Sequence, residues 1–565
     1  MLYITGLAYT RFTLVRNTMP LNWGQLYPYD VYGIRSQRDL TLNVSMNQNV
    51  WPAVNLNSVL FDTLNYTYDA MANIPALVTR GASRLFINLY WNSKKNQFQF
   101  CPFVEDSTSN STVTDSPNVN DLIFSYQNRV YACNSTMTVA NFLQDIVKNQ
   151  VILPTDNNLW ASVIILTFNL RSPTVAQIAN ARRKNEIFKR QDDEGPVTSD
   201  LVSASSLRAA TSTSTSVATT TTINPKSNLG VQIHEVFGDY AYTPSQLTID
   251  RSVTGLTWNE SGISNTGWPL LENVLFKTLH RILFSFGEMD IGLDVYDTSV
   301  DQDYIFDRND IPYSGTHVVN YDASFSSTEL SEIASPVCSF NNMTKINISG
   351  TNITVPPHWL LAQDSSNLTF TADSIRKYLQ CGFSPVLNAT IAPINSMKEY
   401  VISSLSAARW SWAPGQPTEI SNSTATAISA GGVVRRCAVL TSSGWQVDNC
   451  FAKYRVACRV AKSSYNWTLS DKSVTYYNAP THCIGDSVFS LPRTAVQNTM
   501  LQLLRNNEVD NEPIWIDFNS IAQPNCWVSG GSGAQCTYAT QHRILIEVVV
   551  PAVAAVIIAV LLARM

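Results

Sequence analysis

Short apolar runs alternate with helix-like and polar segments along the first half of the chain. Arg84–Trp91 (RLFINLYW), Ala161–Leu170 (ASVIILTFNL) and Ile291–Val295 are apolar and bracketed by turn residues, which is typical of buried strands. Helix-like stretches separate these runs, and strands that alternate with helices favour an α/β layout. The pattern therefore predicts one α/β domain over residues 30–337.

A low-complexity segment, residues 191–227, interrupts this domain. It contains the run SASSLRAATSTSTSVATTTT and almost no large apolar side chain. Such a segment buries too little apolar surface to offset the entropy that it would lose on ordering. We expect a disordered insert that is open to O-glycosylation.

An uninterrupted apolar run, Val548–Ala563, lies at the C-terminal end of the sequence. Counted from Ile544, the run has about 20 residues, which as a helix matches the hydrocarbon thickness of a bilayer. It predicts one transmembrane helix over residues 544–563. The alternative is a lipid anchor that replaces the tail after the small residues SGGSG at 529–533. At the other end, Leu2–Tyr9 is apolar but short, so the secretory signal is missing or atypical.

Cysteines and glycosylation acceptors indicate an oxidising, secretory compartment. The ten cysteines form no CxxC motif and no cluster with zinc spacing, so disulfides explain them better than metal sites do. We expect a single-pass type I membrane glycoprotein with a lumenal or extracellular ectodomain. The Asn-x-Ser/Thr acceptors are Asn43, Asn65, Asn110, Asn134, Asn259, Asn342, Asn347, Asn352, Asn367, Asn388, Asn422 and Asn466.

The charge balance argues against one class of partner. The 565 residues carry a formal net charge of −5, and only 14% of them are charged. A protein that binds nucleic acid needs a clustered basic face to neutralise phosphates. We therefore predict no nucleic-acid partner.

The most specific motifs lie in the region 338–460. This region carries CGF from Cys381, WSWAPGQP from Trp410, CAVLTSSGW from Cys437 and YRVAC ending at Cys458. Together they resemble the C-type lectin-like domain, a fold in which a short disulfide lies inside a long one. The resemblance implies an α+β domain that presents a surface for a protein or glycan ligand.

By this resemblance, the inner bridge joins Cys437 to Cys450 and the outer bridge joins Cys381 to Cys458. The stretch from Cys483 onward loosely repeats the plan, so 461–540 is predicted to be a second, partial lectin-like segment. The remaining cysteines are expected to pair as Cys101–Cys133, Cys526–Cys536 and, by elimination, Cys338–Cys483.

Lectin-like domains that hold sugar through calcium supply several acidic and amide oxygens. At the corresponding places this chain has Gln416-Pro417-Thr418 and, after the tryptophan, Gln446-Val447. None of these residues is an acid, and the Val447 side chain has no oxygen. We predict no calcium site and no cofactor.

The 30–337 region resembles the phospholipase C-like phosphodiesterase barrel in SQRDLT from Ser36, in Thr79–Arg84 and in the strand that follows. Enzymes of that fold use two early histidines as base and acid. Here the first histidine is His234, and Asn88 occupies the strand position of an acid. The resemblance therefore implies a degenerate barrel without catalytic residues.

We also expect that no two titratable side chains meet at the carboxyl ends of the first barrel strands. Glu288 and Asp290 form a carboxylate pair in the sequence, but no partner for it can be identified. The alternative is a divergent phosphodiesterase, or lipid or glycan hydrolase, in which His234, His280 or His317 enters the barrel mouth from the second half.

From end to end, the chain is similar to one fungal family, maintenance of telomere capping protein 6. The similarity rests on RGASRLFINLYWN, Cys101-Pro102, WSWAPGQP, Trp515-Ile516-Asp517 and Cys526-Trp527-Val528. It implies a membrane glycoprotein that takes part in telomere capping. Because an ectodomain across a membrane from the nucleoplasm cannot touch a telomere, this role would be indirect, through a binding or scaffolding ectodomain.

Overall fold

The structure is a computed structural model, and its helices and strands form two units. The first unit is a partly open parallel barrel, and the second is a β-unit near the C-terminus. The described residues are 21–105, 121–127, 129–178, 228–253, 267–290, 296–313, 318–320, 344–348, 351–355, 359–418, 434–460, 465–508 and 512–536.

Seven parallel strands form the barrel, and they follow one another around it in chain order. The last strand pairs with the first, with Val386 opposite Ala53. After the fourth strand, Ser285 makes an isolated parallel bridge to Phe306. The strands are β1 (Ala53–Asn55), β2 (Arg84–Asn92), β7 (Ile164–Arg171), β9 (Ile282–Met289), β10 (Val318–Asn320), β13 (Leu361–Gln363) and β14 (Ser384–Leu387).

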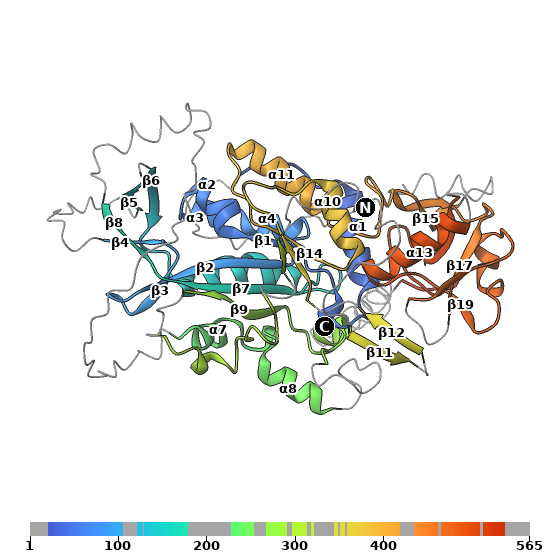
Figure 1. Cartoon of the computed structure of the whole chain (residues 1–565), viewed down its shortest axis with the longest axis horizontal. Helices are drawn as coiled ribbons and strands as arrows, with labels where there is room; N and C mark the ends of the chain where they lie inside the picture. The colour runs from blue at the N-terminus through green and yellow to red at the C-terminus, as the bar shows by residue number, and fades with distance from the viewer. Residues whose placement is uncertain are drawn as a thin grey trace, which may run out of the picture.

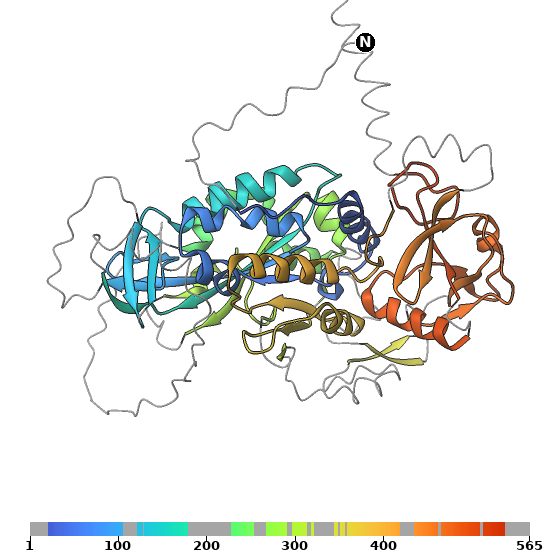
Figure 2. The same ribbon diagram turned by 90° about the horizontal axis from the view of Figure 1, so that it is seen from above.

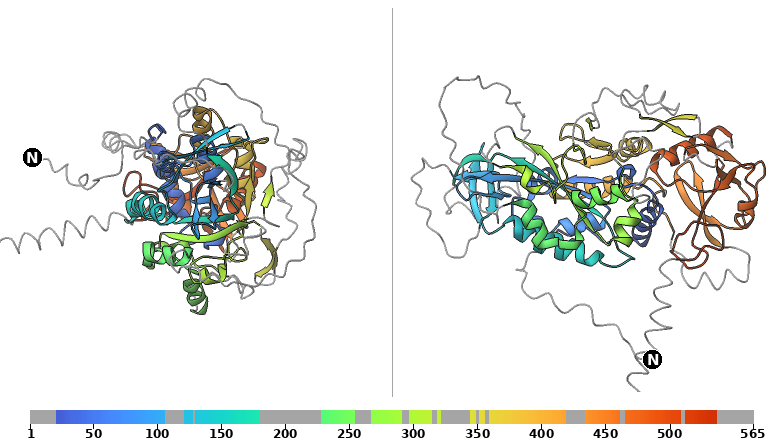
Figure 3. Two further views of the ribbon diagram at one scale, coloured as in Figure 1. Left: turned by 90° about the vertical axis from the view of Figure 1, so that its left-hand side faces the viewer. Right: turned by 90° about the horizontal axis from the view of Figure 1, so that it is seen from below.

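Helices lie on several sides of these strands (Figure 3). Most of them pack their apolar faces against the strands in one large core, which includes Leu77, Phe142, Phe168 and Met397, whereas Leu247 of α8 packs in a separate cluster. These outer elements are α2 (Asp62–Leu64), α3 (Tyr68–Met71), α4 (Ile74–Thr79), α5 (Val139–Asn141), η3 (Phe142–Ile152), α7 (Leu229–Phe237), α8 (Pro244–Ser252), α10 (Ala372–Gln380) and α11 (Ile394–Ala407).

The barrel interior is partly polar. The guanidinium of Arg84 is buried and donates to Thr167 Oγ1 at 3.2 Å and to the carbonyl of Pro312 at 3.1 Å. Thr167 and Ser285 share a hydrogen bond of 2.9 Å between neighbouring strands. Burial lowers the pKa of Arg84 to about 9, because the charged form loses its hydration.

A small sheet lies beyond the carboxyl ends of β2 and β7, at one end of the molecule (Figures 1 and 2). It reaches the barrel through the hairpin strand β3 and through the disulfide Cys101–Cys133. Its strand order is β4-β8-β5-β6. The strands involved are β3 (Gln97–Gln99), β4 (Phe103–Glu105), β5 (Asp121–Tyr126), β6 (Arg129–Asn134) and β8 (Thr174–Ile178).

The C-terminal β-unit lies at the opposite end (Figures 1 and 2). Its sheet has the order β16-β15-β20-β17-β18, and β19 pairs with β17. A separate hairpin joins β11 (Thr344–Ile348) to β12 (Thr351–Val355). The elements of the unit are β15 (Arg435–Thr441), β16 (Gly444–Asn449), β17 (Arg455–Val460), β18 (Trp467–Leu469), β19 (Ser487–Phe489), α13 (Ala495–Glu508) and β20 (Ile514–Asn519).

Helix α1 (Pro28–Leu40) connects the two units. Trp412 Nε1 donates to Ser36 Oγ at 2.8 Å, and Arg35 Nη2 donates to the carbonyl of Asn525 at 2.7 Å. Gln37 Oε1 accepts from the backbone N–H of Trp410 at 3.0 Å. The first helix of the barrel is therefore also part of the interface with the last unit.

Two predicted domain boundaries are wrong. Strands β13 and β14 belong to the barrel sheet, so the barrel extends well past the boundary expected at residue 337. Strand β20 lies between β15 and β17. Residues of the expected segment 461–540 therefore complete the sheet that begins at β15 and do not form a second, partial domain.

Three predicted bridges are confirmed: Cys101–Cys133, Cys437–Cys450 and Cys526–Cys536. The predicted pairs Cys381–Cys458 and Cys338–Cys483 are wrong, because Cys458 pairs with Cys483. The physical reason is that Cys381 is the C-cap of helix α10 in the barrel, while Cys458 lies on β17 of the β-unit. The nested pair of the lectin-like prediction is thus not formed. Cys381 is itself disulfide-bonded, and Cys338 lies outside the described residues.

Within the described ranges, no helix is long and apolar enough to cross a bilayer. Several predictions fall outside these ranges: the insert 191–227, the strand Ile291–Val295, the run Leu2–Tyr9 and the span 544–563. The transmembrane helix and the disordered insert therefore stay predictions.

Candidate functional site

The barrel mouth is the natural first candidate, because active sites of parallel barrels lie at the carboxyl ends of the strands. We use this name for the polar side chains at or just beyond those ends. Four groups form it: an asparagine network, an arginine with two carboxylates, a partly buried aspartate beside two tyrosines, and a buried aspartate between two loops.

Asparagines on neighbouring strands are hydrogen-bonded to one another in the mouth. Asn55 Nδ2 on β1 donates to Asn388 Oδ1 after β14 at 2.6 Å. Asn169 Nδ2 on β7 donates to Asn88 Oδ1 on β2 at 2.9 Å. The backbone N–H of Asn88 donates to Asn57 Oδ1 at 2.7 Å. Because a neutral amide does not exchange protons near neutral pH, this network can orient a ligand but cannot act as acid or base.

Gly287 on β9 makes room for this network. A Cβ at Gly287 would stand 2.1 Å from Asn169 Oδ1, far inside van der Waals contact. Asn169 Oδ1 also accepts from the backbone N–H of Glu288 at 2.9 Å. A side chain at position 287 would therefore displace the Asn169 amide from this network.

Arg171, the last residue of β7, forms ion pairs with Glu288 and Asp290. Its Nη1 lies 2.9 Å from Asp290 Oδ1, and its Nη2 donates to Glu288 Oε2. Burial lowers the pKa of Arg171, but the hydrogen bonds and charges of Asp290 and Glu288 outweigh burial and raise it. The expectation that no titratable side chains meet here is wrong, and Arg171 is the partner of the carboxylate pair that sequence reasoning missed.

Asp62 and Asp364 are the two carboxyls in the described mouth whose pKa burial raises, as in a catalytic acid, and Asp62 has two tyrosines beside it. Burial raises its pKa, although the charge of Arg129 and hydrogen bonds from Tyr66 and Thr390 oppose the rise. Tyr66 Oη donates to Asp62 Oδ1 at 3.3 Å, and burial also raises the pKa of Tyr90 nearby. A raised carboxyl pKa in a barrel mouth is a recognised functional signal.

Asp364, directly after β13, was not singled out from the sequence. It is 3% exposed, and its carboxylate accepts from the backbone N–H groups of Asn388 at 2.6 Å and Phe370 at 3.2 Å. Tyr400 Oη on α11 donates to it as well. These bonds hold the loops after β13 and β14 together, which is a structural role. The feature of the sequence that could have indicated Asp364 is its position at the end of a short apolar run.

The histidines of the alternative hypothesis do not lie in the mouth where the structure describes them. His234 is exposed on α7, with its ring 5.1 Å from that of Tyr304. His280 precedes β9, at the amino end of the barrel, with its ring 5.3 Å from that of Tyr242. His317 lies outside the described residues.

Gln416, where lectin-like domains place a calcium ligand, is used within the protein. Its Oε1 accepts from the backbone N–H groups of Thr418 at 3.0 Å and Val447 at 3.3 Å. Across the described ranges, no group of three or more His, Cys, Asp or Glu side chains is arranged to hold a metal ion.

The predicted glycosylation acceptors differ in exposure. Asn43, Asn367 and Asn466 are exposed, whereas Asn65, Asn134 and Asn388 are partly buried. Asn388 belongs to the mouth network. The remaining acceptors are outside the described residues or have no described side chain: Asn110, Asn259, Asn342, Asn347, Asn352 and Asn422.

Comparison with known proteins identifies similar chains in yeasts. Residues 25–407 match the family model described as the MTC6 partial TIM-barrel domain. A protein of Yarrowia lipolytica is 27% identical over 616 residues, which cover 95% of this chain and 86% of that protein. A protein of Debaryomyces hansenii is 26% identical over 589 residues, covering 95% and 89%. Both are named "Maintenance of telomere capping protein 6". No solved structure matches significantly.

Proposed function

The chain belongs to the family of the MTC6 partial TIM-barrel domain, and from this membership we propose that it contributes to the maintenance of telomere capping. In this proposal the protein is a non-catalytic, single-pass type I membrane glycoprotein whose ectodomain binds or scaffolds. The telomere role comes from the name of its relatives. The membrane anchor comes from the apolar run at 544–563.

One observation carries the non-catalytic part of the proposal. At the carboxyl ends of β1, β2 and β7, where a phosphodiesterase barrel would hold its acid and base, three asparagines are tied to other amides. The neighbouring cation, Arg171, is neutralised by two carboxylates. Each positioned acid or base typically contributes 10²–10⁴-fold in rate, so amides at these three strand ends support binding and not turnover.

A binding role extends to the C-terminal β-unit. We propose in addition that this unit is lectin-like. The expected inner bridge Cys437–Cys450 supports this, whereas the expected outer bridge is not formed. Because the units meet through α1, a ligand on one unit is held in a fixed position relative to the other. Such an ectodomain would affect telomeres indirectly, through a process at the membrane.

A hydrolase is the second candidate, and the raised pKa of Asp62 favours it. In this alternative Asp62 would serve as the general acid, with Tyr66 and Tyr90 beside it. Burial is the main cause of the raised pKa, and structural carboxyls share this property.

Turnover by the purified full chain separates the two candidates. The substrates would be a phosphoinositide, a glycosyl-phosphoinositide and a glycan oligosaccharide, with Asp62→Asn as the matched control. We expect wild type and Asp62→Asn to release no product above a blank. Product that wild type forms and Asp62→Asn does not would replace this proposal with the hydrolase.

Complementation tests the cellular part of the proposal. In a yeast strain that lacks its own family member, wild type and Asp62→Asn should restore telomere capping equally, because neither the charge nor the acidity of Asp62 is required. Failure of wild type would count against the telomere role. Failure of Asp62→Asn alone, at normal protein level, would count against a non-catalytic barrel.

A further inference from the structure

A second site lies at the opposite end of the barrel from the mouth. A cavity of about 510 Å³ is bounded by residues that directly precede β1, β2 and β7, namely Pro52, Ser83 and Val163. Helix α1, the segment that follows η3 and the end of α11 form its other walls. Its volume lies within the range of small-molecule sites, roughly 300–1,000 Å³.

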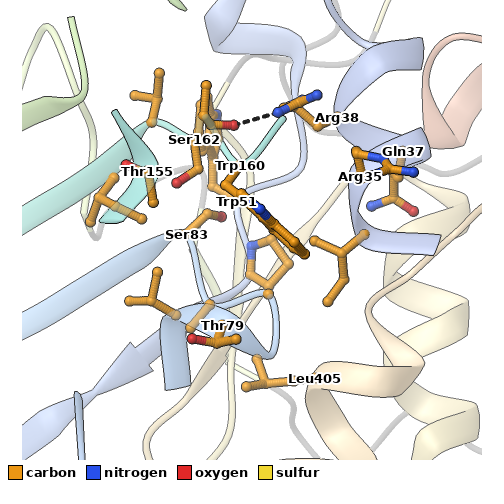
Figure 4. A pocket seen from close by; sticks show the side chains of 18 of the residues that line it. Arg35, Gln37, Arg38, Trp51, Thr79, Ser83, Thr155, Trp160, Ser162 and Leu405 are labelled. Atoms are coloured by element: carbon orange, nitrogen blue, oxygen red, sulfur yellow. Dashed lines mark hydrogen bonds between the residues drawn. The ribbon is translucent and has the colours of Figure 1, made fainter. Parts of the chain in front are cut away.

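The walls of this cavity are mainly apolar. Val31 and Ile34 from α1, Val78 from α4 and Leu405 from α11 contribute aliphatic side chains. Trp51 extends between the walls (Figure 4), and its indole N–H is already bonded to the carbonyl of Met46 at 2.9 Å. Since protein interiors rarely leave spaces larger than a water molecule, an apolar space of this size is suited to an apolar occupant.

The cationic side chains in the walls already interact with protein groups. Arg409 pairs with Asp30 at 2.5 Å and Arg38 pairs with Asp39 at 2.6 Å. The third wall arginine, Arg35, donates to the carbonyl of Asn525 at 2.7 Å. An anionic ligand would have to compete with these carboxylates. The charge pattern therefore favours a neutral ligand.

Two neutral polar groups in the walls lack partners. Asn49 is 7% exposed, and neither its Oδ1 nor its Nδ2 has a hydrogen-bond partner among the described residues. The buried Ser83 Oγ has none either. Leaving a buried polar group unpaired costs about 1–3 kcal/mol, so a ligand with a donor and an acceptor would recover part of that cost after a small side-chain movement.

One residue of the cavity wall is also exposed to solvent. Trp160 is 47% exposed although it lines the cavity. An exposed indole beside an apolar cavity fits a ligand that passes from a membrane or a carrier.

We propose that this cavity binds a neutral lipid whose polar end presents a hydroxyl or amide group. The apolar body would lie against Trp51 and the aliphatic walls, and the polar group would lie beside Asn49 and Ser83. A sterol and a monoacylglycerol share this chemistry. The inference rests on the cavity and is independent of whether the barrel mouth is catalytic.

The test uses photoactivatable probes with the purified full chain in phosphatidylcholine nanodiscs. The probes are a sterol, a monoacylglycerol and a fatty acid, and labelled peptides are mapped by mass spectrometry. We expect one or both neutral probes to label peptides around Trp51 and Trp160, and unlabelled competitor to remove this signal. The two neutral arms show which lipid is preferred. Stronger labelling by the anionic fatty acid, or no labelling of these peptides, would overturn the proposal.

Variants separate the cavity from the membrane as the source of labelling. Val78→Trp occupies the cavity and should abolish the signal, whereas Val175→Trp, on the exposed strand β8, should leave it unchanged. Asn49→Leu keeps the side-chain volume and should weaken binding about tenfold, the equivalent of one hydrogen bond, without lowering the melting temperature. Labelling that both Val78→Trp and Asn49→Leu leave intact would show that the lipid binds elsewhere.

Discussion

At the scale of single residues, Asp364 shows how one carboxylate can fix the seam between the last and the first strand of the barrel. It accepts backbone N–H groups from the loops after β13 and β14 and a hydroxyl from Tyr400. Both loops lie next to the point where β14 pairs with β1. The side chain therefore stabilises the closing strand through the segments on either side of it.

We predict that Asp364→Ala destabilises the protein by about 3–5 kcal/mol, because several buried donors lose their acceptor at once. Denaturant unfolding followed by tryptophan fluorescence would measure this loss. Tyr400→Phe removes one of the donors and should cost only about 1–2 kcal/mol. Similar losses for both variants would contradict the role assigned to Asp364.

Asp62→Asn should stabilise the protein at pH 7. Burial raises the pKa of Asp62 in the folded state, so the folded state binds the proton more tightly than the unfolded chain does. Stability then falls as the pH rises from the unfolded value, about 3.9, through the raised folded value. Asparagine removes this loss, and the gain should disappear at pH 3, where both states are protonated.

Exposed Asp297 serves as the control for this pH dependence. Hydrogen bonds from Ser299 lower its pKa, which is the opposite direction, so Asp297→Asn should not raise stability at pH 7. Unfolding midpoints of both variants at pH 7 and pH 3 would decide. A midpoint for Asp62→Asn at or below wild type at pH 7 would rule out a destabilising charge at this position.

Some residues of the mouth could be predicted from the sequence, and others could not. The resemblance to phosphodiesterase barrels implied that Asn88 stands at the position of an acid, and in the structure Asn88 accepts a hydrogen bond from Asn169. The partner of Glu288 and Asp290 could not be read in this way, since Arg171 is 117 and 119 residues away in the chain. Only the parallel pairing of β7 and β9 brings these side chains together.

At the scale of elements, α1 packs closely against both units. A Cβ at Gly33 would stand 3.2 Å from Arg409 Nη1, and Arg409 pairs with Asp30 of the same helix. Ser36, one turn later, accepts from Trp412. This face of α1 therefore has little room for a larger side chain.

We predict that Gly33→Val displaces Arg409 and lowers stability by about 1–3 kcal/mol, the usual cost of overpacking. Limited proteolysis should then cut near α1 faster than in wild type. Gly533→Val is the matched control, because no heavy atom lies within 4 Å of the added Cβ position. Equal protease resistance in Gly33→Val and wild type would show that α1 tolerates the change.

Disulfide mapping tests the assignment of elements to units. We expect non-reducing digestion followed by mass spectrometry to yield a peptide pair joined through Cys458 and Cys483, because these residues are 5.5 Å apart between Cα atoms. Cys437–Cys450 serves as the internal control. A pair joined through Cys381 and Cys458 would restore the nested lectin-like arrangement.

Element length explains why the barrel was predicted only in part. Strands β2 and β7, with nine and eight residues, stand out as long apolar runs, and both were predicted. Strands β13 and β14, with three and four residues, are too short to show any periodicity. Because the cysteine and tryptophan motifs that follow are strong, the boundary was expected at residue 337. Strands β13 and β14 lie beyond it but still belong to the barrel sheet.

At the scale of the whole molecule, the fold constrains which acceptors can carry glycans. We predict glycans on Asn43, Asn367 and Asn466, which are exposed, and none on Asn388, whose amide oxygen accepts from Asn55 and Ser58 in the mouth. Glycopeptide mapping would test this, and enzymatic deglycosylation should increase gel mobility. A glycan on Asn388, or unchanged mobility, would contradict the prediction.

The pairing of β14 with β1 also has a consequence for synthesis. Residues that meet at this seam are 333 positions apart in the chain. At about 5–20 residues per second, β1 leaves the ribosome on the order of tens of seconds before β14 exists. During that time the apolar edge of β1 has no strand on one side, and such an edge readily pairs with other chains. We expect a nascent chain of this kind to need a chaperone that covers the edge until translation reaches its last barrel strand.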